Sequence, residues 1–343
     1  MNELALTATP VSVPTSRLGT DQAWLTVMAA MTVAELTWWA AAWVSGLAPA
    51  PYFGTYLLLA AAGLAAALAA KAALGKLADR AQWPGILAAT LMVALGASLF
   101  LPLKYIIPRE IPFWLDAPLA ALEHEFFGSD PWLLLDQALG WATVPIDRIY
   151  GLWLPFQTVI LFLVILEPPS PAKSRALIAY TVGWFALGVV AAVLFASAGP
   201  LFYDRLFGGD TFAAMRKTLQ ARGAWVAIAE SDKMWASLAS GKPGIVAGIS
   251  AVPSLHVAIS FWMVLVARAY ARRLVPFALI YMAVIWVGSV QLGWHYVSDG
   301  LAGVVGMAGI WWLAGKIDRK LAEGVGFEPT VGLHPRRFSR PLP

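Results

Sequence analysis

The stretch that reads GISAVPSLH at Gly248–His256 and GWHYVSDG at Gly293–Gly300 places two histidines at the ends of consecutive apolar runs. A short basic turn separates the two runs. If both runs cross a membrane as helices, the chain goes in and comes back. The spacing therefore predicts that His256 and His295 return to one face of the membrane.

The composition is that of a polytopic membrane protein. Hydrophobic residues make up 59% of the 343-residue chain and charged residues only 13%, a balance that excludes a soluble globular domain. The chain has no cysteine, which excludes disulfide bonds, thiolate metal sites and cysteine nucleophiles. The net charge is +4, but the Lys and Arg residues cluster between apolar runs and in the tail. Their placement indicates membrane topology and argues against nucleic-acid binding.

Eight apolar runs are long enough to cross a bilayer, which takes about 20 residues per helix. The leader, 1–22, lacks the features of a signal peptide and is expected in the cytoplasm. The basic tail, 317–343, is rich in Pro and Arg and is expected to be disordered. The predicted spans are 23–47, 52–70, 83–103, 149–167, 174–197, 251–270, 274–294 and 299–316.

Two longer segments, 104–148 and 198–250, are expected on the outer face. The first alternates acidic with aromatic and apolar residues, which is typical of helices lying in the membrane interface. The second is more polar and is predicted to form an extracytoplasmic cap. Together they divide the spans into three groups, with three helices in 23–103, two in 149–197 and three in 251–316.

The charges of the loops predict the orientation of the chain. Cytoplasmic loops carry the excess of Lys and Arg, and every short inner loop is basic if the N-terminus is inside. The outer segment 104–148 instead has three basic residues against seven acidic ones, a net of −4. Both termini are therefore expected in the cytoplasm and both histidine motifs on the extracytoplasmic side.

Glycines recur every third residue along the last predicted helix. Small residues at this spacing let a neighbouring helix approach closely, which would hold the His295 end of the helix rigid. The glycines are Gly300, Gly303, Gly306 and Gly309.

His295 and Asp299 are four residues apart. On a helix the carboxylate would lie one turn from the imidazole and could accept its Nδ1 proton. That contact would leave Nε2 free to act as a nucleophile or a base. The alternative is that His295 is an interfacial histidine and Asp299 a helix cap. Because ionisable residues are costly to bury at membrane depth without a function, the pattern favours chemistry.

Pro253 and Ser254 begin the helix that carries His256. Proline is tolerated in the first turn of a helix. The free N–H groups there, with the Ser254 hydroxyl, predict an anion site of the kind that phosphate occupies. The alternative is that these are ordinary helix-starting residues and that His256 is a buried, satisfied polar residue. Two such motifs on one face favour a joint site.

The two motifs together resemble the second and third signature motifs of the type 2 phosphatidic acid phosphatase (PAP2) superfamily. The resemblance is specific over 250–303, where P-S-L-H is followed by G-W-H-Y-x-x-D. The P-S-L-H form is most similar to the inositolphosphotransferase branch, which includes inositol phosphorylceramide synthases. The resemblance implies an all-α, polytopic membrane helix bundle of about eight helices with a six-helix catalytic core.

The resemblance also implies roles for three residues. In that family the third-motif histidine attacks phosphorus and its aspartate orients it, while the second-motif histidine protonates the leaving group. His295 would then be the nucleophile, Asp299 its partner and His256 the general acid. The implied substrate is a lipid phosphate or phospholipid, with water or a polyol such as inositol as acceptor. No cofactor and no metal is implied, since both histidines and the aspartate already have roles.

Two departures from the family pattern concern the cations that bind phosphate. Lys104 matches the start of the first motif, but Ile111 stands where the motif has arginine, and Ser289 stands where the third motif has arginine. Because phosphoryl transfer depends on stabilising charge on the phosphoryl oxygens, Lys104 is expected to need help from other outer cations. The candidates, each of which could equally be a solvated or headgroup-facing charge, are Arg109, Arg148 and Arg205.

The sequence therefore predicts a metal-independent lipid phosphatase or phosphotransferase of a bacterial inner membrane, with its site on the extracytoplasmic side. Two alternatives stay open. A proton-coupled transporter or lipid flippase could use the same ionisable residues as a relay, although the inverted repeats and broken helices typical of transporters are not evident. A non-catalytic family member would account for the missing arginines.

Overall fold

The structure is a computed structural model of the whole chain. It describes residues 18–76, 78–241 and 248–324. Most of the predicted leader, 1–22, and most of the predicted disordered tail, 317–343, therefore lie outside the described residues. The parts that are described are helical, since the first helix begins at Leu18 and the last continues through Gly324.

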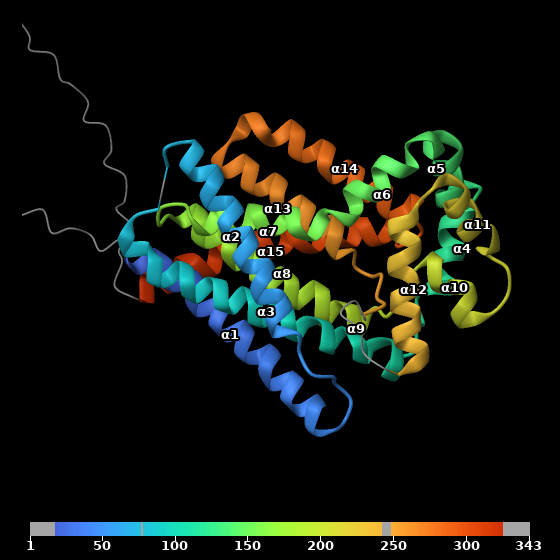
Figure 1. Cartoon of the computed structure of the whole chain (residues 1–343), viewed down its shortest axis with the longest axis horizontal. Coiled ribbons are helices and arrows are strands. Elements are labelled where there is room, and N and C mark those ends of the chain that lie inside the picture. Colours follow the sequence, from blue (N-terminus) through green and yellow to red (C-terminus); the bar gives the residue numbers. More distant parts are fainter. Residues whose placement is uncertain (1–17, 77, 242–247, 325–343) are drawn as a thin grey trace, which may run out of the picture.

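The described residues form helices joined by turns, which confirms the predicted all-α fold (Figure 1). A π-helical segment, Ala186–Ala191, joins α8 to α9. Short 3₁₀ turns precede α3 (η1, Arg80–Gln82) and α14 (η4, Arg272–Leu274). The α-helices are α1 (Leu18–Val44), α2 (Phe53–Ala73), α3 (Trp83–Glu110), α4 (Asp116–Phe127), α5 (Pro131–Leu139), α6 (Thr143–Gly151), α7 (Trp153–Ile165), α8 (Pro171–Phe185), α9 (Ala192–Leu194), α10 (Pro200–Phe207), α11 (Ala213–Arg222), α12 (Trp225–Ser240), α13 (Leu255–Tyr270), α14 (Val275–Gln291) and α15 (Val297–Gly324).

Six of the described helical stretches are long and apolar enough to cross a membrane. These six correspond to α1, α2, α3, α8 with α9, α14 and α15. The other two predicted spans take a different form. The α5–α6 stretch and α7 make a candidate span that is bent by 47°, and α13 is apolar but has only 16 residues.

Prolines explain both departures. Pro155 has no N–H to donate to the carbonyl of Gly151, so the helix cannot run straight from α6 into α7. Pro253 disfavours helical geometry in the residue before it, and α13 begins only at Leu255. The chain before α13 is thus extended and carries the first histidine motif toward the end of the bundle.

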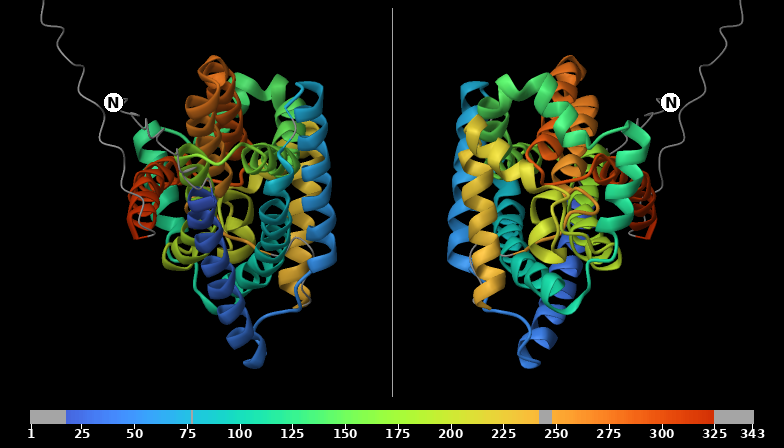
Figure 2. Two further views of the ribbon diagram at one scale, coloured as in Figure 1. Left: turned by 90° about the vertical axis from the view of Figure 1, so that its left-hand side faces the viewer. Right: turned by 90° about the vertical axis from the view of Figure 1, so that its right-hand side faces the viewer.

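Five helices surround the middle of the molecule. Helix α3 packs against both α1 and α2, α7 packs against α2 and α8, and α8 packs against α1. The five helices therefore form a closed ring in the order α1, α3, α2, α7 and α8. On one side of the ring α8 also packs against α13 and α15, and α13 against α14. Seen along the long axis, α2 and α15 lie at opposite edges of the bundle (Figure 2).

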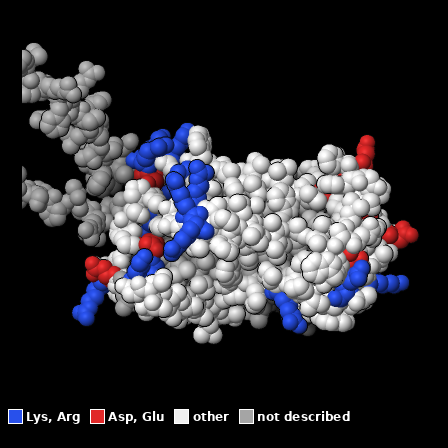
Figure 3. All heavy atoms as spheres, turned by 90° about the horizontal axis from the view of Figure 1, so that it is seen from above, with Lys and Arg blue, Asp and Glu red and all other residues white. Residues whose placement is uncertain are grey.

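The two ends of the bundle differ. One end, the cap end, is built from α4, α5, α6 and α10 to α12 (Figure 1). The other, the basic end, contains η1, η4 and the end of α15, and Lys and Arg side chains gather there (Figure 3). On the face shown in Figure 3, a band without charged side chains lies between the two ends. Apolar side chains face outward along the bundle, such as Leu58, Ile280 and Val305, which are 74%, 62% and 63% exposed. An uncharged, apolar belt of this kind is what a lipid bilayer requires.

Asp147, on α6, holds α12 in place at the cap end. Its two carboxylate oxygens accept hydrogen bonds from the N–H groups of Val226 and Ala227, each at 2.8 Å. These N–H groups belong to the first turn of α12 and have no acceptor within their own helix. A carboxylate on α6 therefore satisfies the start of α12 and holds this helix over the bundle.

Candidate active site

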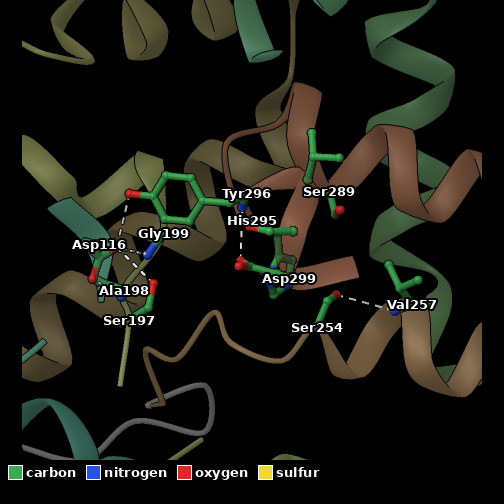
Figure 4. A network of polar contacts seen from close by, with 12 residues as sticks. Asp116, Ser197, Ala198, Gly199, Ser254, Val257, Ser289, His295, Tyr296 and Asp299 are labelled. Atoms are coloured by element: carbon green, nitrogen blue, oxygen red, sulfur yellow. Dashed lines mark hydrogen bonds and ion pairs between the residues drawn. The ribbon is translucent and has the colours of Figure 1, made fainter. Parts of the chain in front are cut away.

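His295 and Asp299 form the pair that their spacing predicts. The Nδ1 atom of His295 lies 3.2 Å from Oδ2 of Asp299, and the same oxygen accepts the N–H of Tyr296 at 2.9 Å (Figure 4). The histidine is 5% exposed and the aspartate is fully buried. A carboxylate bonded at Nδ1 favours the tautomer with the proton on that nitrogen, so Nε2 is left with its lone pair.

His256 lies opposite this pair, in the first turn of α13. Its ring stacks on Tyr150 with centroids 4.7 Å apart and lies 4.2 Å from the ring of Trp153. Trp153 also donates its Nε1–H to the main-chain carbonyl of His256 at 3.2 Å. The centroids of the His256 and His295 rings are 6.1 Å apart. Both rings line one cavity, so they can act on the same bound group.

The main chain ties the two histidine motifs together. The N–H of Ser254 donates to the carbonyl of Asp299 at 3.0 Å. The hydroxyl of Ser254 accepts the N–H of Val257 at 3.4 Å and so caps α13. Ser254 is fully buried and is not among the residues that line the cavity. The structure thus gives the Ser254 hydroxyl a capping role and does not bring it to the place where a phosphate would lie.

The glycines of α15 let neighbouring segments approach closely, as expected, but each glycine faces a different segment. An added Cβ would lie 2.1 Å from Trp286 of α14 at Gly300, and 2.5 Å from the carbonyl oxygen of Ser254 at Gly303. At Gly306 it would lie 2.7 Å from Leu187, and at Gly309 it would meet nothing within 4 Å. Positions three apart rotate around a helix of 3.6 residues per turn, which explains why each glycine faces a different neighbour.

Asp116, on α4, supports the segment that carries His295. Its carboxylate accepts hydrogen bonds from the hydroxyl of Tyr296 at 3.2 Å and from Ser197 at 3.0 Å, and from the N–H groups of Ala198 and Gly199 at 2.8 and 2.9 Å (Figure 4). Burial raises the pKa of the Asp116 carboxyl, while these four hydrogen bonds oppose the rise. The carboxylate joins the chain after α9 to the residue that follows the proposed nucleophile.

Glu123, also on α4, caps α15. Its oxygens accept the N–H of Val297 at 3.0 Å and both the N–H and the hydroxyl of Ser298, at 2.7 and 2.8 Å. The sequence alone did not indicate either carboxylate, because the acids of 104–148 were interpreted as interfacial charges. The available signal was their spacing, since Asp116 and Glu123 are seven residues apart and so share one face of an α-helix.

A cavity of about 440 Å³ opens beside the two histidines. Its size is that of a small-molecule or cofactor site. Lys104 lines it together with His256 and His295. The side chain of Lys104 passes Gly248, where an added Cβ would lie 2.4 Å from its Cβ, and its Nζ lies 5.4 Å from the centre of the Phe100 ring. Of the described residues that line the cavity, Lys104 is the one with a cationic side chain.

The structure does not bring the other predicted cations to this cavity. Arg109 donates to the hydroxyl of Tyr105 at 2.7 Å. Arg205 pairs with Asp232 at 3.3 Å on the cap. Arg148 is exposed on the surface of α6. The hydroxyl of Ser289, at the position of the second missing arginine, is taken by the carbonyl of Trp286 at 2.7 Å.

Within the described ranges, no group of three His, Asp or Glu side chains is placed to hold a metal ion. The residues at the site are instead suited to nucleophilic and proton-transfer chemistry. A histidine with a free Nε2 and a carboxylate at Nδ1 is an activated nucleophile. A second imidazole that lines the same cavity can donate and accept a proton.

A family model described as the PAP2 superfamily matches residues 118–313. The match covers more than half of the chain. It includes both histidine motifs and Asp299, and it leaves out α1 to α3 and Lys104. Searches of curated proteins and of solved structures found no match.

Proposed function

Because this chain belongs to the PAP2 superfamily, we propose that it is a membrane-embedded phosphatase or phosphotransferase that acts on a lipid phosphate ester. The observation that carries the proposal is the placement of two imidazole rings 6.1 Å apart, one of them bonded to a buried carboxylate. This arrangement is the minimum that nucleophilic catalysis with acid–base assistance needs.

The proposed reaction has two steps. In the first, Nε2 of His295 attacks phosphorus, the P–O bond to the lipid alcohol breaks, and His256 in its protonated form gives its proton to the departing oxygen. In the second, His256 takes a proton from the acceptor hydroxyl, whose oxygen attacks the phosphohistidine and releases His295. Asp299 stabilises the positive charge that develops on the His295 ring. Lys104 offsets the negative charge of the phosphoryl oxygens.

The acceptor decides between hydrolysis and transfer. Water gives an inorganic phosphate, and a polyol such as inositol gives a polyol phosphate. The P-S-L-H form of the first histidine motif and the cap over the cavity support transfer to a polyol. In the cap, α12 lines the cavity with Ala227, Glu230 and Met234, so it can limit the access of water.

The proposed orientation puts the cap end outside and both termini in the cytoplasm of a bacterial inner membrane. The support is the gathering of Lys and Arg at the basic end (Figure 3). Positive charge is enriched on the cytoplasmic side of membrane proteins. The histidines would then meet the headgroups of the outer leaflet.

Trapping of the intermediate tests the proposal. The purified protein is given a lipid monophosphate labelled in its phosphate, with and without inositol. His295→Ala is expected to abolish label on the protein, and His256→Ala to slow turnover by roughly 10²-fold or more, as for a lost general acid. The matched control is His124→Ala, which removes a histidine whose side chain is 64% exposed and paired with Asp130.

The outcomes separate the alternatives. Label in free phosphate identifies a phosphatase, and label in a new inositol phosphate identifies a transferase. Full activity of His295→Ala or of His256→Ala would refute the assigned roles. Movement of the intact lipid phosphate across vesicles, without loss of phosphate, would instead support a flippase.

A further inference from the structure

The deep part of the cavity carries several polar side chains in a lining that is otherwise mostly apolar. The cavity runs from the histidines between the five ring helices. Its deep part is lined by α1, α2 and α3, which lie outside the matched family region, and by α7 and α8, which lie inside it. We call Glu35, Tyr56 and the hydrogen-bonded pair of Gln157 and Tyr180 the polar floor. The Tyr180 hydroxyl donates to Oε1 of Gln157 at 2.7 Å.

Glu35 is the least expected member of the polar floor. It lies in the middle of the candidate span of α1, is 6% exposed and lines the cavity. Among the described residues, no side chain or main-chain group forms a hydrogen bond or ion pair with its carboxyl group. Gly96 of α3 makes room for it, since an added Cβ there would lie 3.1 Å from Oε2 of Glu35.

A buried carboxyl group without a partner is costly. Removing a polar group from water without a hydrogen bond costs about 1–3 kcal/mol by mutational measures, and ionisable residues inside a membrane are usually functional. Thr32, one turn earlier on α1, contrasts with it, because its hydroxyl is satisfied by the carbonyl of Met28 at 2.9 Å. The carboxyl group of Glu35 therefore has its hydrogen-bonding capacity free for a molecule in the cavity.

The distance from the phosphate position follows from helix geometry. Gly96, beside the Glu35 carboxyl group, precedes Lys104 by eight residues on α3. At 1.5 Å of rise per residue the two positions are about 12 Å apart along the helix. Gln157 lies one turn beyond Trp153, the residue that packs on His256. The polar floor thus lies well below the site of phosphoryl transfer, at the depth of a lipid's hydrocarbon part.

We propose that this chain selects lipid phosphates whose hydrocarbon part carries a hydroxyl group at the depth of Glu35, and that Glu35 binds this hydroxyl. The inference rests on the proposed function, since the phosphate must sit between the histidines for one hydroxyl position to be preferred. A plain hydrocarbon chain would leave Glu35 unpaired, whereas a hydroxyl group would satisfy it. Glu35, which would give the selectivity, lies on α1 outside the matched family region, whereas both histidines lie within it.

A positional series of substrates tests the inference. Alkyl monophosphates of one chain length, either plain or hydroxylated at successive carbons, are compared for phosphate release by the wild-type protein. The same compounds are compared for binding to the His295→Ala protein. The wild type is expected to prefer one hydroxyl position over the plain chain by about tenfold, which is the worth of one buried hydrogen bond.

Variants at two positions of α1 locate the effect. Glu35→Leu is expected to abolish the preference, so that hydroxylated and plain chains are turned over at equal rates. Glu35→Gln, which keeps a hydrogen-bonding group, is expected to retain part of the preference. Thr32→Val is the matched control, because the hydroxyl it removes already has a partner within α1, and the preference should survive.

The results for the inference and for the proposed function are distinguishable. Equal turnover and equal binding of all compounds would overturn the inference and leave the proposed function standing. A binding preference that depends on Glu35, without phosphate release or transfer to inositol from any compound, would support the inference and refute the function. A preference that survives Glu35→Leu would overturn the role of Glu35.

Discussion

Asp299 supports the proposed nucleophile with a single oxygen. Oδ2 contacts both Nδ1 of His295 and the N–H of Tyr296, at 3.2 and 2.9 Å. The second contact fixes the carboxylate relative to the main chain, so the first can orient the ring. The negative charge also stabilises the imidazolium form that appears when Nε2 is bonded to phosphorus.

Asp299→Asn is expected to lower the rate of phosphohistidine formation on the order of 10³-fold, because the amide keeps the shape but removes the charge and can invert the tautomer. Single-turnover trapping with labelled lipid phosphate measures this rate. Asp130→Asn is the matched control, since Asp130 contacts the exposed His124 at 2.7 Å in a similar pair. Equal effects of the two substitutions would contradict the role of Asp299.

Lys104→Met is expected to lower kcat/KM by about 10²–10³-fold, since it removes the cation proposed to offset the charge of the phosphoryl oxygens. The Met side chain keeps most of the apolar stem, so packing against Gly248 and Phe100 is retained. Steady-state phosphate release measures the effect. Lys217→Met, at an exposed position of α11, should leave the rate unchanged. A Lys104→Met protein as active as this control would show that another group binds the phosphate.

Contacts between residues close in sequence could be predicted, whereas contacts between residues distant in sequence could not. The spacing of His295 and Asp299 predicted their contact, although His295 precedes α15 and the Asp299 side chain reaches back to it from the first turn of the helix. The stacking of Tyr150 on His256 joins residues 106 positions apart, for which the sequence has no local signal. Arg205 was a candidate phosphate ligand only because the predicted topology places it on the outer side of the membrane. Its partner Asp232 lies on another helix of the cap.

At the scale of elements, α15 approaches α13 through Gly303. The carbonyl of Ser254 would lie 2.5 Å from an added Cβ at this position. The same segment contains the N–H of Ser254 that bonds to Asp299. The contact therefore sets the distance between α13, which carries His256, and α15, which begins two residues after His295.

Gly303→Ala is expected to destabilise the fold by about 1–3 kcal/mol, as overpacking does, and to lower activity by displacing His256 from His295. Thermal unfolding and phosphate release measure the two effects. Gly309→Ala on the same helix is the matched control, because an added Cβ there meets nothing within 4 Å. It should be neutral or slightly stabilising, since alanine favours helix more than glycine. Similar losses in both variants would refute the close-contact argument.

Glu123→Gln tests the cap of α15. The amide can accept with only one oxygen, so it cannot satisfy both the N–H of Val297 and the two donors of Ser298 as the carboxylate does. It also removes a negative charge from the N-terminus of a helix. A loss of about 1 kcal/mol of stability is expected, with a lower kcat and an unchanged KM. Glu125→Gln, an exposed position of α4, is the control. A raised KM with unchanged kcat would contradict this account.

The helices themselves were largely predictable from the lengths of the apolar runs, because a helix needs about 20 apolar residues to cross a bilayer. The bend between α6 and α7 was missed, since a proline inside an apolar run does not interrupt its hydropathy. Asp116 and Glu123 were missed for a related reason. Acidic residues on an amphipathic helix fit the pattern of an interfacial helix. That pattern does not predict which N–H or hydroxyl groups will donate hydrogen bonds to them.

At the scale of the molecule, the chain offers a direct test of its orientation because it contains no cysteine. Single cysteines can be introduced at the exposed Lys217 of the cap end and the exposed Arg272 of the basic end. A membrane-impermeant thiol reagent added to intact cells is expected to label Lys217→Cys and not Arg272→Cys. Leu58→Cys, at a lipid-facing position that is 74% exposed, should resist the reagent from both sides. Labelling of Arg272→Cys alone would reverse the proposed orientation.

The ring of α1, α3, α2, α7 and α8 was beyond prediction from the sequence. Hydropathy predicts that a helix spans the membrane, but the order in which spans pack depends on side-chain contacts along their whole length. The position of Lys104 illustrates this. It lines the same cavity as the histidines because α3 closes the ring beside the extended segment at Gly248, and the match to the first motif does not give that placement.

The hydrogen bond between the N–H of Ser254 and the carbonyl of Asp299 involves no side chain. Alanine scanning of the histidines therefore cannot delete it, and this link between the two halves of the reaction centre is kept in His256→Ala and in His295→Ala. Rate losses from His256→Ala, His295→Ala and the double variant can accordingly be compared in a thermodynamic cycle as pure functional-group effects. Non-additivity in that cycle would report how strongly proton donation and bond formation to phosphorus are coupled.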